Sequence, residues 1–294
     1  MVEVGASVLE PALQNKRDAL IDCLRAMECV AVAFSGGIDS TVVAKAAFLA
    51  LESNAIAVTA DSPSVARADL ADARRLAELI GIRHEVIATT EFDDPEYVRN
   101  DGSRCYFCKS ELYTRIERLA PSLGARFIVS GANVDDLGDY RPGLKAAAEH
   151  GIRHPLQETG FRKSDVRELA KHWELPTWDK PASPCLSSRL APGVQVTTER
   201  TERVEKAEAY LRNLGLREFR VRLHEGELAR IEVPLEALPL FLEPAKRLAL
   251  AEYLKDLGFR FVTLDLEGFR SGNLNALVTL EHKLRYTPAK ETIS

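Results

Sequence analysis

"VAVAFSGGIDSTVVAK", residues 30–45, contains an apolar run, a glycine turn and a second apolar segment in direct succession. The run at 29–34 is continuously hydrophobic, as in a strand buried within a parallel sheet, and the segment after the turn has a helical composition. Similar strand-like runs follow at 55–60, 84–89 and 126–132, and helical segments separate them at 41–52, 65–81, 110–124 and 163–175. This alternation predicts an α/β fold with a doubly wound parallel sheet, and Ser164 is expected to cap the last of these helices.

The pattern changes after the proline-rich stretch 175–193. Beyond it we expect an amphipathic helix, two strands joined near Gly226, another helix and a last strand, at 197–215, 219–233, 244–258 and 259–268. These elements predict a smaller C-terminal α+β domain. We therefore divide the chain into a first domain at 15–193, a substrate-binding or oligomerisation domain at 194–275 and a tail at 276–294.

Composition excludes several classes of protein. The 294 residues are 46% hydrophobic and 28% charged, and the net charge of -5 argues against an electrostatic grip on bulk nucleic acid. No apolar run reaches about 18 residues, so no membrane span is expected. The N-terminus lacks the pattern of a signal peptide. Five cysteines without regular spacing indicate a reducing, cytoplasmic protein, in which a C-x-x-C pair more often binds metal or acts in catalysis.

The turn between the first strand and helix has the features of an anion site. Gly36 and Gly37 let the backbone approach a ligand closely, and the helix N-terminus favours a negative charge. Ser35 and Ser40 add hydroxyl donors, whereas Asp39 suits a phosphate only if it orients a cation or caps the helix. The loop lacks the lysine of a Walker A motif. A tight turn with a capped helix is the alternative explanation for S-G-G alone.

The full S-G-G-x-D-S pattern after an apolar strand resembles the PP-loop pyrophosphatase superfamily, whose members cleave ATP between the α and β phosphates and form adenylates. The resemblance implies that pyrophosphate is held by Ser35, Gly36, Gly37, Asp39 and Ser40. It also places Asp61, in the T-A-D-S that ends the second strand, near the nucleotide. Mg²⁺ accompanying ATP needs one or two carboxylates, and the loop at 131–143 offers Asp135, Asp136 and Asp139.

Four further motifs make the resemblance more specific. They are RCYFCKSELY, GANVDDLGDYRPG, KPASPCLSSRLAPG and FRVRLHEGELARIEV, at 104–113, 131–143, 180–193 and 219–233. Together they resemble the LarE family of ATP-dependent sulfur transferases, over residues 15–268. This family adenylates a carboxylate of pyridinium-3,5-dicarboxylate mononucleotide and converts it to a thiocarboxylate during nickel-pincer nucleotide biosynthesis. The resemblance therefore implies ATP, Mg²⁺ and this mononucleotide as ligands.

LarE proteins differ in their sulfur source. In one type a cysteine at the position of Cys185 gives up its own sulfur and becomes dehydroalanine. In the other type that cysteine joins a C-x-x-C pair, here Cys105 and Cys108, to hold a 4Fe-4S cluster. All three cysteines are present, so the resemblance implies the cluster type, with Cys185 at the catalytic position and an external sulfide donor. Three thiolates leave one iron open for an added ligand. A sacrificial Cys185, a zinc half-site and a redox pair are the alternatives.

Charged residues around the last motif suit a substrate phosphate. Arg220 and Arg222 alternate on one predicted strand and so share a face, where two guanidinium groups can bind a phosphate. Arg189 can serve the same anion or keep Cys185 ionised. Glu208 and Glu232 are candidate ligands for a metal or the substrate. A solvated strand face and exposed surface carboxylates are the alternatives.

Two other functions remain open. A tRNA thiolase also combines this loop with cysteines, although the acidic charge balance and the lack of an RNA-binding module argue against it. A nucleotide- or zinc-binding protein without turnover is the alternative outside enzymes. If the chain functions as a LarE-like sulfur transferase, we also expect it to form a homo-oligomer.

Overall fold

A four-stranded parallel sheet forms the centre of the N-terminal part of the chain. The computed structural model describes residues 9–137, 141–181, 183–270, 274 and 277–278. The strands are β1 (Val30–Ala33), β2 (Ala55–Asp61), β3 (Arg83–Ala88) and β4 (Phe127–Val129), in the order β3-β2-β1-β4. Because β1 pairs in parallel with both β2 and β4, it lies inside the sheet, as its apolar sequence predicts.

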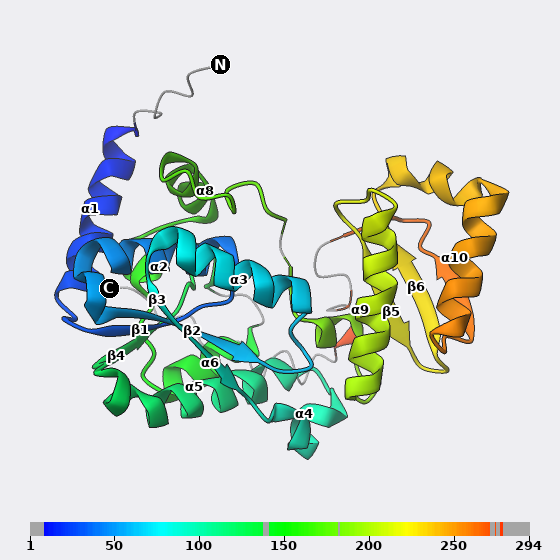
Figure 1. The fold of residues 1–294 in the computed structure, drawn as a ribbon, viewed down its shortest axis with the longest axis horizontal. Helices are drawn as coiled ribbons and strands as arrows, with labels where there is room; N and C mark the ends of the chain where they lie inside the picture. The colour runs from blue at the N-terminus through cyan, green and yellow to red at the C-terminus, as the bar shows by residue number, and fades with distance from the viewer. Residues whose placement is uncertain (1–8, 138–140, 182, 271–273, 275–276, 279–294) are drawn as a thin grey trace.

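Helices cover both faces of this sheet (Figure 1). Val30 and Val32 of β1 pack against one layer of helices, whereas Ala31 and Ala33 pack against the other. The first layer contains α1 (Pro11–Arg25), α2 (Ile38–Leu51), α3 (Arg67–Ile80) and α8 (Lys163–His172). The second contains α5 (Arg104–Leu123) and α6 (Pro142–Glu149). The predicted doubly wound α/β fold is therefore confirmed.

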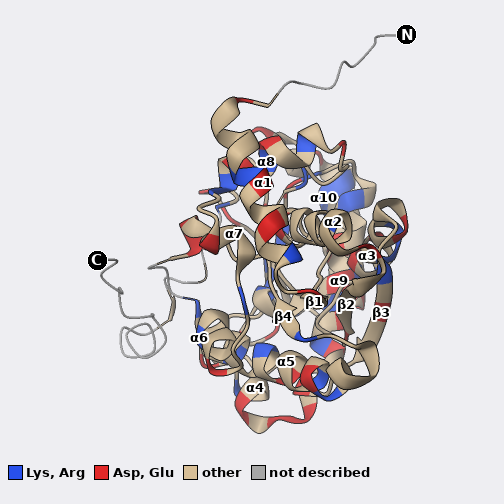
Figure 2. Cartoon of the chain, turned by 90° about the vertical axis from the view of Figure 1, so that its left-hand side faces the viewer, with Lys and Arg blue, Asp and Glu red and all other residues tan. Residues whose placement is uncertain are grey.

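Shorter helices lie between these elements and in the C-terminal part of the chain. They are the α-helices α4 (Pro95–Arg99) and α7 (Pro155–Glu158) and the 3-10 helices η1 (Glu52–Asn54), η2 (Glu91–Asp93), η3 (Val134–Asp136), η4 (Leu186–Arg189) and η5 (Leu235–Leu242). Among the described residues, no helix is long and apolar enough to cross a membrane. Basic and acidic residues are interspersed along the ribbon on the side shown in Figure 2.

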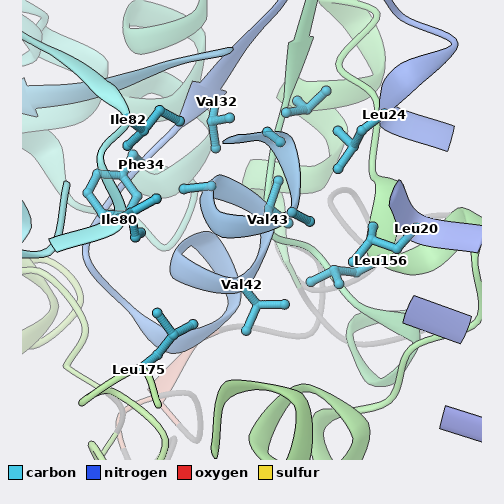
Figure 3. Close-up of a cluster of buried hydrophobic side chains, with 14 of the residues drawn as sticks. Leu20, Leu24, Val32, Phe34, Val42, Val43, Ile80, Ile82, Leu156 and Leu175 are labelled. Carbon is cyan, nitrogen blue, oxygen red and sulfur yellow. The ribbon is translucent and has the colours of Figure 1, made fainter. Parts of the chain in front are cut away.

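Helix α2 is the most deeply enclosed helix of the first layer. Val42 and Val43 are fully buried and lie among Leu20 and Leu24 of α1 and Leu156 (Figure 3). Each such side chain contributes about 1.5–3 kcal/mol when it leaves water. The start of α2, which carries the predicted phosphate loop, is therefore held on a rigid support.

The C-terminal unit has its own three-stranded sheet, in the order β5-β6-β7. Its elements are α9 (Thr198–Asn213), β5 (Arg220–His224), β6 (Leu228–Glu232), α10 (Pro244–Asp256) and β7 (Phe261–Leu264). β5 and β6 form an antiparallel hairpin, and Gly226 in its turn has a φ of +74°. The α+β elements predicted from the sequence are thus present.

The core of this unit also recruits residues that precede it in sequence. Leu186, Leu190 and Ala191 pack with Val221 of β5, and Tyr97 of α4 joins the same cluster. Residues 186–191, which precede the predicted boundary at 193, therefore pack both with α4 and with the C-terminal unit. The domain boundary at 193 stays a prediction.

Two local predictions differ from the structure. Helix α5 begins at Arg104, not at 110, so Cys105 and Cys108 lie in its first turns. Ser164 is not the cap of α8, because the helix already begins at Lys163. Asp165 takes the capping role by accepting a hydrogen bond from the Arg162 amide at 2.9 Å.

Candidate active site

The predicted phosphate loop leaves the carboxyl end of β1 and enters α2 directly. Gly36 has a φ of +70°, and a Cβ at this position would lie 3.2 Å from the Ala73 Cα of α3. Both the backbone conformation and the contact with α3 therefore favour glycine. The second glycine, Gly37, is the N-cap of α2.

Hydroxyl groups fix the shape of this loop. The Ser40 Oγ accepts from the Ser35 amide at 3.2 Å and donates to the Gly37 carbonyl at 3.0 Å. The Ser35 and Ser40 hydroxyl oxygens lie 3.2 Å apart. The Thr41 hydroxyl also donates to the Gly37 carbonyl, at 2.9 Å. Ser35, Gly36, Gly37 and Ser40 are therefore gathered at the N-terminus of α2, where an anion is favoured.

A second loop, which follows β4, packs against the first. A Cβ on Gly131 would lie 2.7 Å from the Ser40 backbone nitrogen, so glycine allows the two loops to touch. The Asn133 side chain donates to Asp39 Oδ1 at 3.1 Å. The Lys163 ammonium, from the start of α8, forms an ion pair with the other oxygen of Asp39. Asp39 is therefore held between an amide and a cation.

The remaining loop carboxylates have structural partners. Asp136 accepts from the Asn133 amide at 2.9 Å, and Asp135 accepts from the Lys163 amide at 2.8 Å. At the end of β2, Asp61 forms a 2.6 Å ion pair with Arg67. Asp139 lies outside the described residues.

The three cysteines come from two segments. Cys105 and Cys108 lie at the start of α5, and Cys185 is the N-cap residue of η4. Burial raises the pKa of the Cys108 thiol, and Glu91, Cys185 and Cys105 each add to this effect. Cys105 and Cys185 are therefore near enough to Cys108 to affect the pKa of its thiol. Within the described ranges, however, no three His, Cys, Asp or Glu side chains converge closely enough to hold a metal ion.

Hydrogen bonds hold residues 185–194, called the Cys185 segment below, against α4 and α5. The Arg104 guanidinium donates to the Ser187 carbonyl at 2.7 Å, and the hydroxyls of Tyr97 and Ser187 lie 2.8 Å apart. The Asn100 side chain donates to the carbonyls of Ala191 and Val194 at 2.9 and 2.8 Å. These contacts bring Cys185 to the C-x-x-C pair. Three thiolates are the donor set of an iron-sulfur cluster that leaves one iron open.

Two of the predicted substrate residues form buried ion pairs. Arg189 is 3% exposed and binds both carboxylate oxygens of Glu208, at 2.9 and 3.1 Å. Arg222 is 6% exposed and contacts Glu232 at 2.9 Å. The alternatives of a solvated strand face for Arg222 and of surface carboxylates for both glutamates are therefore wrong. Each pair also reaches the Cys185 segment, since Arg189 donates to the Cys185 carbonyl at 3.2 Å and Arg222 to the Ser188 carbonyl at 3.1 Å.

Arg220 lies beside these pairs. Burial lowers its pKa to about 10, and the nearby guanidinium groups of Arg189 and Arg222 act in the same direction. Glu208 and Glu232 only partly oppose this effect. Arg189, Arg220 and Arg222, called the arginine cluster below, thus lie beside Glu208 and Glu232 and next to the Cys185 segment.

Comparisons with known proteins agree with this fold. A family model described as "Asparagine synthase" matches residues 14–100, which include the phosphate loop. An uncharacterized protein of Synechocystis sp. is 47% identical over 92% of this chain and all of its own length. The pyridinium-3,5-bisthiocarboxylic acid mononucleotide synthase of Lactiplantibacillus plantarum is 40% identical over 91% of this chain and 96% of its own length. The tRNA-specific 2-thiouridylase MnmA of Azorhizobium caulinodans is 33% identical, over 52% of this chain and 49% of its own length.

The parallel sheet, the S-G-G-x-D-S loop at the N-terminus of α2 and these matches define an ATP-dependent enzyme of the PP-loop class. The similarity to the Lactiplantibacillus synthase extends through the C-terminal unit as well. The chain belongs to the LarE family of ATP-dependent sulfur transferases.

Sequence reasoning missed two features of this site. Lys163 contacts Asp39 although 124 positions separate them, and no local motif marks it. Asn133 lies in a run of turn-forming residues, so a turn alone accounts equally well for an asparagine at this position. The position of Asn133 after β4 could have predicted its contact with the phosphate loop. β4 pairs in parallel with β1, so the residues that follow the two strands lie at the same edge of the sheet.

Proposed function

We propose that this chain adenylates a carboxylate of pyridinium-3,5-dicarboxylate mononucleotide and converts it to a thiocarboxylate. The observation that carries the proposal is the similarity to the Lactiplantibacillus synthase over nearly the whole of both chains. The structure supports it with a phosphate loop at the N-terminus of α2, three neighbouring thiols, and buried arginines that donate to the Cys185 segment. The test is pyrophosphate release on adding Mg²⁺, ATP and this mononucleotide. We expect release with the mononucleotide and none with unmodified tRNA, and the reverse result would favour a tRNA thiolase.

In the first step the loop residues bind the β and γ phosphates of ATP. The backbone of Gly36 and Gly37 and the hydroxyls of Ser35 and Ser40 supply hydrogen bonds at the positive end of α2. Asp39 is the loop carboxylate best placed for the Mg²⁺ that accompanies ATP, because it lies in the first turn of α2. Asp61, at the adjacent strand end, is the proposed contact for the rest of the nucleotide. A substrate carboxylate oxygen then attacks the α-phosphorus and pyrophosphate leaves.

In the second step a sulfur nucleophile attacks the carbonyl carbon of the acyl adenylate. The bond from that carbon to the AMP oxygen breaks, AMP leaves with the oxygen, and a thiocarboxylate remains. We propose that Cys105, Cys108 and Cys185 hold a 4Fe-4S cluster, supplied with sulfide by an external donor. When bound, such a cluster presents sulfur at its open iron. Arg104, whose pKa is raised by the nearby thiols, and Lys109 are the cations that favour thiolates at these positions. In the alternative, Cys185 itself supplies the sulfur, and its neighbours then only orient it.

The arginine cluster is the proposed position of the substrate phosphate. We expect Arg220→Ala to weaken binding of the pyridinium mononucleotide by about 1–3 kcal/mol, the range for charge-assisted hydrogen bonds. ATP binding should hardly change. Calorimetry measures both affinities, with the 79% exposed Arg217 replaced by alanine as the control. Arg222→Ala is a poorer test, because it also removes a partner of the fully buried Glu232. Loss of ATP affinity with unchanged mononucleotide affinity would contradict this assignment.

We also propose that the chain forms a homo-oligomer through its C-terminal unit. Large apolar side chains are exposed there, and β7 is an edge strand: the exposed residues include Leu235, Leu242, Leu248, Phe261 and Leu266. A second copy can bury such residues. Light scattering should give a mass that is a multiple of one chain, and Phe261→Lys should reduce it. A monomer at all concentrations would contradict this proposal.

The cytoplasmic location expected from the cysteine content stays a prediction. Reduced thiols at positions 105, 108 and 185 support it, since cluster assembly requires thiolates.

A further inference from the structure

Glu91 is a buried carboxylate whose hydrogen bonds are incomplete. It begins η2, shortly after β3, and the residue is 3% exposed. Its Oε1 accepts a hydrogen bond from the Ser64 hydroxyl at 3.3 Å, whereas its Oε2 is buried without a hydrogen-bond partner. Among the described residues, no basic side chain forms an ion pair with it. Buried carboxylates are normally paired, so this one needs an explanation.

Contacts from η2 and Ser64 reach both segments that carry the three cysteines. The amide and the hydroxyl of Thr90 donate to Glu111 of α5, at 3.2 and 3.0 Å, and so fix η2 against the helix of the C-x-x-C pair. Ser64, which donates to Glu91, also accepts a hydrogen bond from the Leu186 amide at 2.8 Å through its carbonyl. Glu91 therefore lies where α5, the end of β2 and the Cys185 segment meet.

The charge of Glu91 acts on the thiols nearby. Burial is the largest cause of the raised pKa of the Cys108 thiol, and the negative charge of Glu91 is the next. A charge that disfavours a thiolate at this place favours a cation there by the same interaction. Because Glu91 is buried, salt and water screen its charge less than that of a surface carboxylate.

We propose that the charge of Glu91 selects the pyridinium form of the substrate. This specificity rests on the proposed function, in which the mononucleotide brings a carboxyl group to the three cysteines. The pyridinium ring is the cationic part of that substrate, whereas its phosphate and carboxylates are anions. The arginine cluster suits the phosphate, and the negative charge of Glu91 suits the ring. Glu91 acts through its charge without touching the ring, so it is a specificity-determining residue and not a catalytic one.

The test compares two ligands that differ in the charge of the ring. They are pyridinium-3,5-dicarboxylate mononucleotide and its 1,4-dihydropyridine form, in which an added hydride makes the ring neutral. Their phosphate and carboxylates are the same, so the ratio of the two affinities isolates the ring charge. Calorimetry without ATP or sulfide measures both. Glu91→Gln should lower the preference for the pyridinium form by roughly 5- to 50-fold, the effect of one charge in a partly buried site. An unchanged ratio would overturn the proposal.

Two further substitutions at position 91 test the charge itself. Glu91→Asp keeps the charge and should retain most of the preference. Glu91→Leu removes the charge and needs no hydrogen-bond partner when buried, so it should lose the preference as Glu91→Gln does. Thermal unfolding shows that each variant is folded. A preference that survives in Glu91→Leu would overturn the proposal.

A purely structural role, in which Glu91 only holds η2 in place, predicts a different result. Ser64→Ala removes the hydrogen bond to Glu91 but leaves its charge, and the matched control Glu111→Gln weakens the attachment of η2 to α5. We expect both variants to keep the preference for the pyridinium form. If both lost it to the same extent as Glu91→Gln, the proposal would be overturned.

Failure of this inference can be told apart from failure of the proposed function. Tight binding of the pyridinium form with a preference that does not depend on Glu91 would overturn the role of Glu91 alone. If the unaltered protein bound neither form, the proposed substrate would be wrong, and the inference would fall with it.

Discussion

Alanine at Asp39 or Ser40 is expected to abolish pyrophosphate release that depends on the substrate. Ser40 links the two sides of the phosphate loop through the Ser35 amide and the Gly37 carbonyl, and Asp39 is the proposed magnesium ligand. Loss of one positioned group of this kind typically lowers the rate constant by a factor of about 10²–10³. A coupled assay for pyrophosphate measures the loss.

Both variants should remain folded, because neither side chain belongs to the apolar core. Asp22→Ala and Ser122→Ala are matched controls, since Asp22 forms an exposed ion pair with Arg25 and the Ser122 hydroxyl donates to a carbonyl within α5. Their rates should equal that of the unaltered protein. Unchanged pyrophosphate release in both Asp39→Ala and Ser40→Ala would rule out the phosphate loop as the ATP site.

Loss of any one of the three cysteines is expected to remove most of the bound iron. Alanine at Cys105, Cys108 or Cys185 leaves two thiolates, and a cubic cluster with two protein ligands is poorly held. After anaerobic reconstitution, iron analysis and visible absorption should show a strong loss in each variant. Cys23→Ala and Cys29→Ala should keep the iron, because Cys23 lies beside Glu158 and Cys29 directly precedes β1.

If Cys185 is sacrificial, the three cysteine variants are expected to differ from one another in activity. Cys185→Ala would then be inactive, whereas Cys105→Ala and Cys108→Ala would stay active. The unaltered protein would also become lighter by one hydrogen sulfide after a single turnover. Iron-free protein after reconstitution, together with this change in mass, would contradict the cluster.

Local sequence was sufficient to predict the framework of the fold. The apolar runs at 29–34 and 55–60 correspond to β1 and β2, because continuous apolar segments are typical of strands in a sheet buried on both faces. The phosphate loop was equally local, since its glycines and hydroxyls act within six residues of one another.

Contacts between distant segments could not be predicted in this way. Arg189 was expected at the substrate, but its partner Glu208 lies on α9, and the pair is buried. Glu232 is fully buried and pairs with Arg222 across the β5–β6 hairpin and with Arg230 on its own strand. Such pairings depend on tertiary packing, and the charge pattern of one strand does not distinguish them from a solvated face.

The central claim, sulfur transfer to an activated carboxylate at the three-cysteine site, has one direct test. The reconstituted protein is incubated anaerobically with Mg²⁺, ATP, pyridinium-3,5-dicarboxylate mononucleotide and isotopically labelled sulfide, and mass spectrometry then records both the product and the protein. We predict labelled thiocarboxylate in excess of the protein, whose mass does not change. Unlabelled product limited to one equivalent, with a lighter protein, would contradict the cluster as the source of sulfur, and the absence of any thiocarboxylate would contradict the proposed function itself.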